Sequence, residues 1–139
     1  KDTIPVGYIV GIEDSTDFFS WLDGYWLPIL RKRYPKTYNA ETDLEKFIIR
    51  MIHTNLTLEE FLINYPAQMH IDLLPETQGK GLGKKLMEAF INRLEDLEVP
   101  GIHFGVSKVN EKAINFYKKL GFNILKENSD SYIMGMELL

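Results

Sequence analysis

A glycine-rich segment, Gln78-Gly79-Lys80-Gly81-Leu82-Gly83, separates a strand-like segment from an amphipathic one. A strand is predicted over Gln68–Leu74, where apolar and polar residues alternate, and Pro75 closes it. A helix is predicted over Lys80–Leu97, because its apolar residues recur at three- and four-residue spacing. The sequence must therefore fold so that a strand leads through a tight glycine loop into a helix.

The rest of the chain adds further elements around this junction. Downstream, we predict a strand over 102–107, a helix capped by Asn110 and ended by Gly121, and strands over 122–125 and 132–137. Upstream, we predict a strand over 6–11 and a helical insertion over about 15–64, which includes a capping box at Thr57 and Glu60. Gly24 is predicted to interrupt the insertion's first helix. Strand–helix–strand units require a parallel pair, so the predicted class is α+β with a mixed central sheet flanked by helices.

Composition excludes several classes of protein. The 139 residues suit one domain, and a net charge of −4 disfavours a nucleic-acid binder. No apolar run reaches the roughly 18 residues of a membrane span, so no membrane partner is expected. Without cysteine, the chain has no disulfide, thiolate nucleophile or cysteine zinc site, and a reducing, cytoplasmic location is expected. The histidines, His53, His70 and His103, do not have metal-ligand spacing, so no metal is expected.

The glycine loop has the properties of an anion site. Glycines allow backbone N–H groups to approach a ligand closely, and the start of a helix favours negative charge. Lys80, Lys84 and Lys85 add positive charge. The spacing matches neither the Walker A loop nor the dinucleotide fingerprint. A phosphate or pyrophosphate ligand is the physical interpretation, and a glycine turn without a ligand is the alternative.

Two motifs together resemble a known family. Gln78-x-x-Gly81-x-Gly83 looks like the loop with which GNAT N-acyltransferases bind the pyrophosphate of coenzyme A. The segment from Asn110 to Phe122 resembles the family signature N-x-x-A-x-x-x-Y-x-x-x-G-F. The resemblance implies the GNAT fold, acetyl-CoA as cosubstrate, and direct transfer of an acetyl group to an amine. The cofactor-binding residues that it implies are Leu73, Leu74, Gln78, Gly79, Lys80, Gly81, Leu82, Gly83, Lys84, Asn110, Ala113, Phe116 and Tyr117.

The resemblance also suggests catalytic roles. Tyr117 is implied as the acid that protonates the departing thiolate, although it also fits a packing stripe. Asn110 is equally suited to cap a helix. His70 and Asp72 lie on one face of their strand, where Asp72 could act as base or support His70; a structural His–Asp pair is the alternative. Gln68 lies near the position of the catalytic Glu in histone-modifying relatives, and it cannot ionise.

Residues 6–66 resemble one branch of the family in particular. Several short segments are arranged as in the acetyltransferase-like domain of O-GlcNAc hydrolases and its free-standing bacterial relatives: Gly7-Tyr8, Phe18-Phe19, Trp26-Leu27-Pro28, Arg33-Tyr34-Pro35 and 61–66. Family members carry a strand, helices and another strand before the position of residues 6–11, so that portion is expected to be missing. The expected organisation is one GNAT-like domain over 1–139, with a partial N-terminal part over 1–66 and an acetyl-CoA-binding core over 67–139. The sheet edge left exposed could pair with a second copy in a homodimer.

Three functions follow from these observations. The first is an acetyl-CoA-dependent N-acetyltransferase acting on a small-molecule or protein amine. The second is a non-catalytic acyl-CoA-binding or interaction module, favoured by the absence of the strand Glu. The third is a nucleotide phosphate-binding protein of another class.

Overall fold

The computed structural model describes residues 4–55 and 59–139. They form two compact units. The first unit combines both ends of the chain, up to Ser15 and from Glu60 onward, and the second comprises the segment between them. Within the described ranges, no helix has both the length and the apolar character needed to cross a bilayer.

The first unit is built on a five-stranded sheet in the order β1-β2-β3-β5-β4. Its strands are β1 (Gly7–Ile12), β2 (Ala67–Leu73), β3 (Gly101–Ser107), β4 (Asn123–Glu127) and β5 (Ser131–Glu137). Strands β2 and β3 are parallel, whereas β1 with β2, β3 with β5, and β4 with β5 are antiparallel. The predicted α+β class with a mixed sheet is confirmed.

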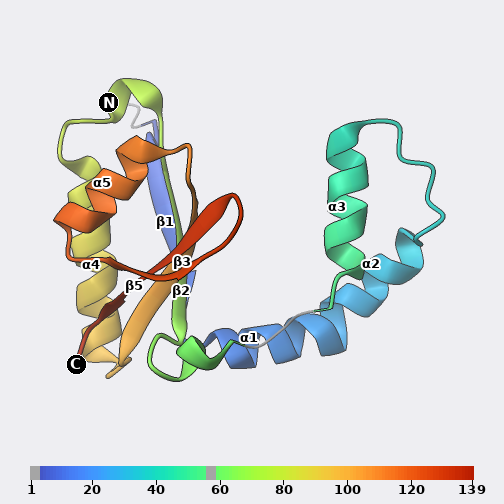
Figure 1. The fold of residues 1–139 in the computed structure, drawn as a ribbon, viewed down its shortest axis with the longest axis horizontal. Helices are drawn as coiled ribbons and strands as arrows, with labels where there is room; N and C mark the ends of the chain where they lie inside the picture. Colours follow the sequence, from blue (N-terminus) through green and yellow to red (C-terminus); the bar gives the residue numbers. More distant parts are fainter. Residues whose placement is uncertain (1–3, 56–58) are drawn as a thin grey trace. The chain divides into compact units, whose positions relative to one another are not determined.

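Two helices of this unit, α4 (Leu82–Asp96) and α5 (Glu111–Lys119), contribute to one hydrophobic core with the sheet. Met87 of α4 and Ile114 and Tyr117 of α5 are buried with Met69 of β2 and Phe104 of β3. Successive side chains of a strand point to opposite faces, and the core residues Met69 and Phe104 belong to the face that packs on α4 and α5. Both helices therefore cover the same face of the sheet, as Figure 1 shows. Short 3₁₀ turns, Glu60–Ile63 and Pro75–Thr77, lead into and out of β2.

The second unit is helical, as predicted for the insertion. Its elements are α1 (Ser15–Trp21), which enters this unit at Thr16, a π-helical turn over Leu22–Trp26, α2 (Leu27–Arg33) and α3 (Asp43–His53). Arg31 links α2 to the end of α3, because its Nε donates to the carbonyl of Ile52 at 2.9 Å. Its guanidinium also pairs with Asp23 of the π-helical turn at 3.0 Å.

Two local predictions in this region concern Gly24 and Thr57. The interruption predicted at Gly24 is confirmed, because α1 ends at Trp21 and α2 begins at Leu27, and Gly24 lies in the π-helical turn between them. The capping box predicted at Thr57 and Glu60 lies partly outside the described residues, since Thr57 is not among them. A capping box does occur at the start of α3, where the Thr42 hydroxyl accepts from the Glu45 N–H at 3.2 Å and the Glu45 carboxylate accepts from Thr42.

His103 of β3 is buried, with 4% of its surface exposed. Its Nδ1 lies 2.6 Å from the carbonyl of Tyr65, and a carbonyl only accepts, so Nδ1 carries the proton. Burial lowers the pKa of His103, and the hydrogen bonds to the backbone of Tyr65 and Ala67 oppose that shift. His103 is therefore a buried histidine whose ring is hydrogen-bonded to the backbone.

We expect acid to destabilise the fold through His103. Its pKa is lower in the folded than in the unfolded chain, so between the two values the unfolded chain binds the extra proton. The free energy of unfolding therefore falls as the pH drops below about 6.5. Urea unfolding at pH 7.5 and 5.5 measures this loss. His103→Gln, which keeps a donor for Tyr65, should reduce it, and His70→Gln, at an exposed position, should not; equal pH dependence in all three proteins would contradict the assignment.

Candidate functional site

Strands β2 and β3 separate soon after they begin. Their parallel pairing covers Ala67 with Ile102 and Gln68 with His103. Beyond it, β2 continues to Leu73 beside β1, and β3 continues to Ser107 beside β5. The sheet therefore opens on the carboxyl side of these two pairs, where ligands of parallel sheets commonly bind.

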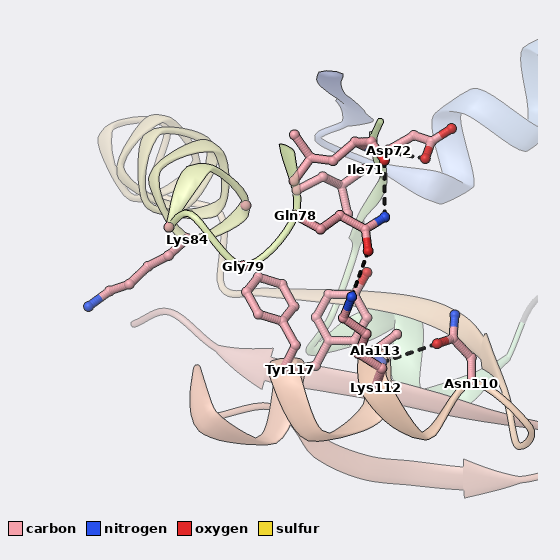
Figure 2. A pocket seen from close by; sticks show the side chains of 13 residues that line it. Ile71, Asp72, Gln78, Gly79, Lys84, Asn110, Lys112, Ala113 and Tyr117 are labelled. Atoms are coloured by element: carbon pink, nitrogen blue, oxygen red, sulfur yellow. Dashed lines mark hydrogen bonds between the residues drawn. The ribbon is translucent and has the colours of Figure 1, made fainter. Parts of the chain in front are cut away.

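A cavity of about 430 Å³ lies at this opening. Its walls come from the end of β2, the glycine loop with the start of α4, and α5 from its cap at Asn110 to Tyr117 (Figure 2). The lining residues are Ile71, Asp72, Leu73, Gln78, Gly79, Gly81, Gly83, Lys84, Asn110, Lys112, Ala113, Phe116 and Tyr117. Segments distant in the sequence therefore meet at one site.

The free edge of β2 is occupied by side chains instead of a neighbouring strand. The Leu74 N–H donates to the Val6 carbonyl at 2.8 Å, so the N–H and C=O of Leu73 point to the opposite edge, toward the opening. There the Leu73 N–H donates to Asp72 Oδ1 at 2.9 Å, and Gln78 Nε2 donates to the Leu73 carbonyl at 3.1 Å. A ligand carrying amide groups could replace both partners.

The glycine loop presents bare backbone to the cavity. Gly79 and Gly81 have φ angles of +75° and +80°, and an added Cβ on either would meet nothing within 4 Å. Gly81 is the residue before α4, where N–H groups of the first turn have no helical partner. The open space at the glycines, the N–H donors of the first turn of α4 and the positive end of its helix dipole together make this loop chemically suited to a phosphate group.

The α5 wall brings a phenol into the cavity. Asn110 caps the helix, because its side chain accepts from the Ala113 N–H at 3.1 Å. Tyr117 lies one helical turn beyond Ala113. It is 9% exposed, and its ring centroid lies 4.2 Å from that of Phe104. Burial raises the pKa of Tyr117, so its hydroxyl stays protonated at neutral pH and can donate.

The sheet face opposite the helices carries polar groups next to the cavity. Tyr8 and Val10 of β1 stand opposite Asp72 and His70 in the antiparallel register. All four residues are exposed, and the rings of Tyr8 and His70 have centroids 6.0 Å apart. Asp72 also lines the cavity, so it connects this face with the opening. The strand face that His70 and Asp72 share is therefore an exposed one.

A comparison with known families identifies the chain. The sequence model of the Acetyltransferase (GNAT) family matches residues 9–122, most of its length. The chain belongs to the GNAT family. The family resemblance and the fold predicted from the two motifs are thereby confirmed.

Similar proteins agree with this assignment. The solved structure of SsHAT superposes with a TM-score of 0.81 at 31% identity, over 96% of this chain and 67% of that one. The mycothiol acetyltransferase of Nocardiopsis dassonvillei is 44% identical over 48 residues, 34% of this chain and 14% of that protein. The peptidyl-lysine N-acetyltransferase YjaB of Salmonella typhimurium is 36% identical over 58 residues, 40% of this chain and 37% of that protein. The matches thus span less than two fifths of these curated relatives.

Most of the residues predicted for the site of this GNAT member line the cavity. Those found there are Asp72, Leu73, Gln78, Gly79, Gly81, Gly83, Lys84, Asn110, Ala113, Phe116 and Tyr117. Its described lining does not include Leu74, Lys80, Leu82 or His70. Leu74 turns its N–H toward β1 instead of the opening, and His70 lies on the exposed sheet face.

Sequence reasoning missed two lining residues, Ile71 and Lys112. Ile71 shares the helix-covered face of β2 with Leu73, so strand alternation could have found it. Lys112 occupies the first turn of α5, where a cation opposes the helix dipole, and that mismatch could have indicated an anionic ligand. Among residues 4–55 and 59–139, His, Asp and Glu side chains form no group of three that could hold a metal ion.

We expect Gly81→Ala to destabilise this GNAT chain by about 1 to 2 kcal/mol, because a side chain at φ +80° is strained even in open space. Gly24→Ala is the matched control, since Gly24 lies in a helical turn with a negative φ and nothing within 4 Å of its added Cβ. That change should leave stability unaltered or slightly raised. Thermal unfolding measures both, and equal effects would show that the loop tolerates a side chain.

Proposed function

We propose that this GNAT family member transfers an acetyl group from acetyl-CoA to a primary amine. One observation carries the proposal: a single cavity combines a phosphate-suited glycine loop, the free edge of β2 and the protonated Tyr117 hydroxyl. The loop would hold the pyrophosphate, and the exposed N–H and C=O of Leu73 would bind the amide-containing arm that follows it. Acetyl-CoA supplies the thioester whose acetyl group is transferred.

A base must prepare the amine. Alkyl ammonium groups have pKa values near 10 and are protonated at neutral pH, so a nucleophilic amine forms only after a proton is removed. Gln68 cannot accept that proton, which leaves the exposed Asp72 and His70 on the same strand. Asp72 is the better placed of the two, because it also lines the cavity.

An acid completes the transfer. The amine nitrogen forms a bond to the acetyl carbon while the bond from that carbon to sulfur breaks. The Tyr117 hydroxyl gives its proton to the departing thiolate, and the phenolate regains one from the nitrogen, which is acidic once acylated. The products are an amide and a free thiol, with one proton left on the base.

A non-catalytic acyl-CoA-binding module is the second candidate. The observation that favours it is Gln68, half-buried near the position where histone-modifying relatives carry a catalytic Glu. In this case the cavity would bind the thioester, and no amine would be acetylated.

Ligand-dependent thermal unfolding followed by an acceptor screen tests the proposal. Acetyl-CoA at 100 times its Kd should stabilise the protein by about 2.7 kcal/mol, a shift of several degrees, and ATP should not. Release of free thiol is then followed with a panel of amines. The panel includes lysine peptides, because the Salmonella relative is named for peptidyl-lysine.

The outcomes separate the candidates. Stabilisation by acetyl-CoA with thiol release on an amine supports the transferase. Stabilisation with no turnover on the panel favours the binding module. Stabilisation by ATP and not by acetyl-CoA would overturn both in favour of a nucleotide site.

A further inference from the structure

Lys112 reaches across the cavity from α5 to the glycine loop. Its Nζ donates to Gln78 Oε1 at 2.7 Å, although the two residues are 34 positions apart. The amide nitrogen of the same Gln78 donates to the Leu73 carbonyl at 3.1 Å. Leu73, Gln78 and Lys112 thus form a chain of hydrogen bonds from β2 to α5. Figure 2 draws the bonds of Gln78 as dashed lines.

The helix dipole disfavours a cation at Lys112, although Glu111 adds a negative charge to the same turn. Lys112 lies in the first turn of α5, where the positive end of the helix dipole repels a cation. Its bond to Gln78 is made to a neutral amide oxygen, which attracts an ammonium less strongly than a charged oxygen does. An anionic ligand in the cavity would improve both interactions.

The other lining lysine differs from Lys112. Lys84 lies 3.6 Å from the carboxylate of Glu88, so its charge is partly balanced. Figure 2 shows its side chain directed away from Lys112 and Gln78. The charged residues in the described lining are Asp72, Lys84 and Lys112. Of the two lysines, Lys112 is the one that a hydrogen bond links to the glycine loop.

We propose that Lys112 binds a phosphate oxygen of the acyl carrier and makes this site selective for a phosphorylated pantetheine thioester over an unphosphorylated one. Gln78 holds the Lys112 ammonium and the Leu73 carbonyl while no ligand is present, and it releases both when the carrier binds. The inference rests on the proposed function, because it takes the acetyl-CoA site as given.

The bridge joins two polar groups of the cavity through one side chain. The Gln78 amide donates to the Leu73 carbonyl and accepts from the Lys112 ammonium, and both contacts are exposed. The exchange of the neutral Gln78 oxygen for an anionic oxygen would strengthen the bond that Lys112 makes.

The test compares Lys112→Met with Lys119→Met, which removes a lysine of the same helix outside the cavity lining. Titration calorimetry gives the Kd of acetyl-CoA at low and high salt. NMR titration gives the affinity for S-acetylpantetheine, which lacks phosphate. We expect Lys112→Met to weaken acetyl-CoA binding about tenfold and to reduce its salt dependence, since one charge pair is lost. S-acetylpantetheine binding should change less than twofold, and Lys119→Met should change neither.

Several results would overturn the inference. Equal effects of the two substitutions, tighter acetyl-CoA binding by Lys112→Met, or equal losses for both thioesters would each do so. If S-acetylpantetheine binds too weakly to measure, an unchanged salt dependence in Lys112→Met is the contrary result. Failure of the unmodified protein to bind acetyl-CoA would instead reject the proposed function, so the two failures are distinguishable.

Discussion

Asp72→Asn is expected to lower kcat for acetyl transfer about a hundred- to ten-thousandfold, the usual contribution of a general base. The affinity for acetyl-CoA should stay within about twofold. Asparagine cannot take a proton from an ammonium, but its side-chain oxygen can still accept the Leu73 N–H that Asp72 Oδ1 accepts. Steady-state kinetics with an amine found in the screen, together with calorimetry, measure the two quantities.

The pH dependence of the variant gives a second measurement. Without a base, only the small fraction of free amine can react, and this fraction rises tenfold per pH unit below the amine pKa. The loss of kcat/KM in Asp72→Asn should therefore shrink steadily as the pH is raised. A merely structural role for Asp72 would give a loss that does not depend on pH.

His70→Gln decides between two forms of the mechanism. His70 lies two residues before Asp72 on the same exposed face, with its ring beside that of Tyr8. If Asp72 takes the proton itself, His70→Gln keeps most of the activity. If His70 takes the proton with support from Asp72, both variants lose activity to a similar extent. Full activity of Asp72→Asn would contradict both forms.

The elements that sequence predicted well are those with local signals. The Asn110 side chain accepts from an N–H three residues away, and Gly121, which follows the C-cap Leu120 of α5, has a φ of +99°. Both interactions are fixed by neighbours in the chain, so residue type and spacing reveal them. The same holds for β2 and α4, where alternation and helical periodicity extend over whole elements.

The opening between β2 and β3 could not be predicted in this way. Nothing in the residues of β2 indicates that parallel pairing ends at Gln68, because pairing depends on the path of β3 in three dimensions. Lys112 enters the cavity only because α5 lies against that opening, so the motif around Asn110 did not identify it.

The exposure of His70 and Asp72 shows a related limit. Alternation correctly grouped them on one face of the strand. It could not tell that α4 and α5 both cover the other face, the one carrying Met69, since helix placement follows from the connections between strands. Sequence alone therefore did not show that this polar face, next to the opening, is exposed.

Tyr117→Phe is expected to lower kcat about ten- to a hundredfold with acetyl-CoA, while thermal stability changes by less than about 1 kcal/mol. The ring keeps its contacts with Phe104, Phe116 and Phe122, and only the hydroxyl is lost. We expect a loss of kcat at the lower end of the usual range for acid catalysis, because a thiol with a pKa near 8.5 is already a moderate leaving group. Tyr117→Ala, by contrast, should destabilise the core by about 3 to 5 kcal/mol, the usual cost of truncating a buried aromatic ring.

The leaving group distinguishes acid catalysis from packing. An acetyl thioester of a more acidic thiol needs no proton on departure, so Tyr117→Phe and the unmodified protein should cleave it at similar rates. Because burial raises the pKa of Tyr117, the unmodified protein should retain its proton donor up to pH 9. A loss of kcat that is equal for both thioesters would assign the hydroxyl to positioning, and no loss for either would leave Tyr117 as a packing residue of the core.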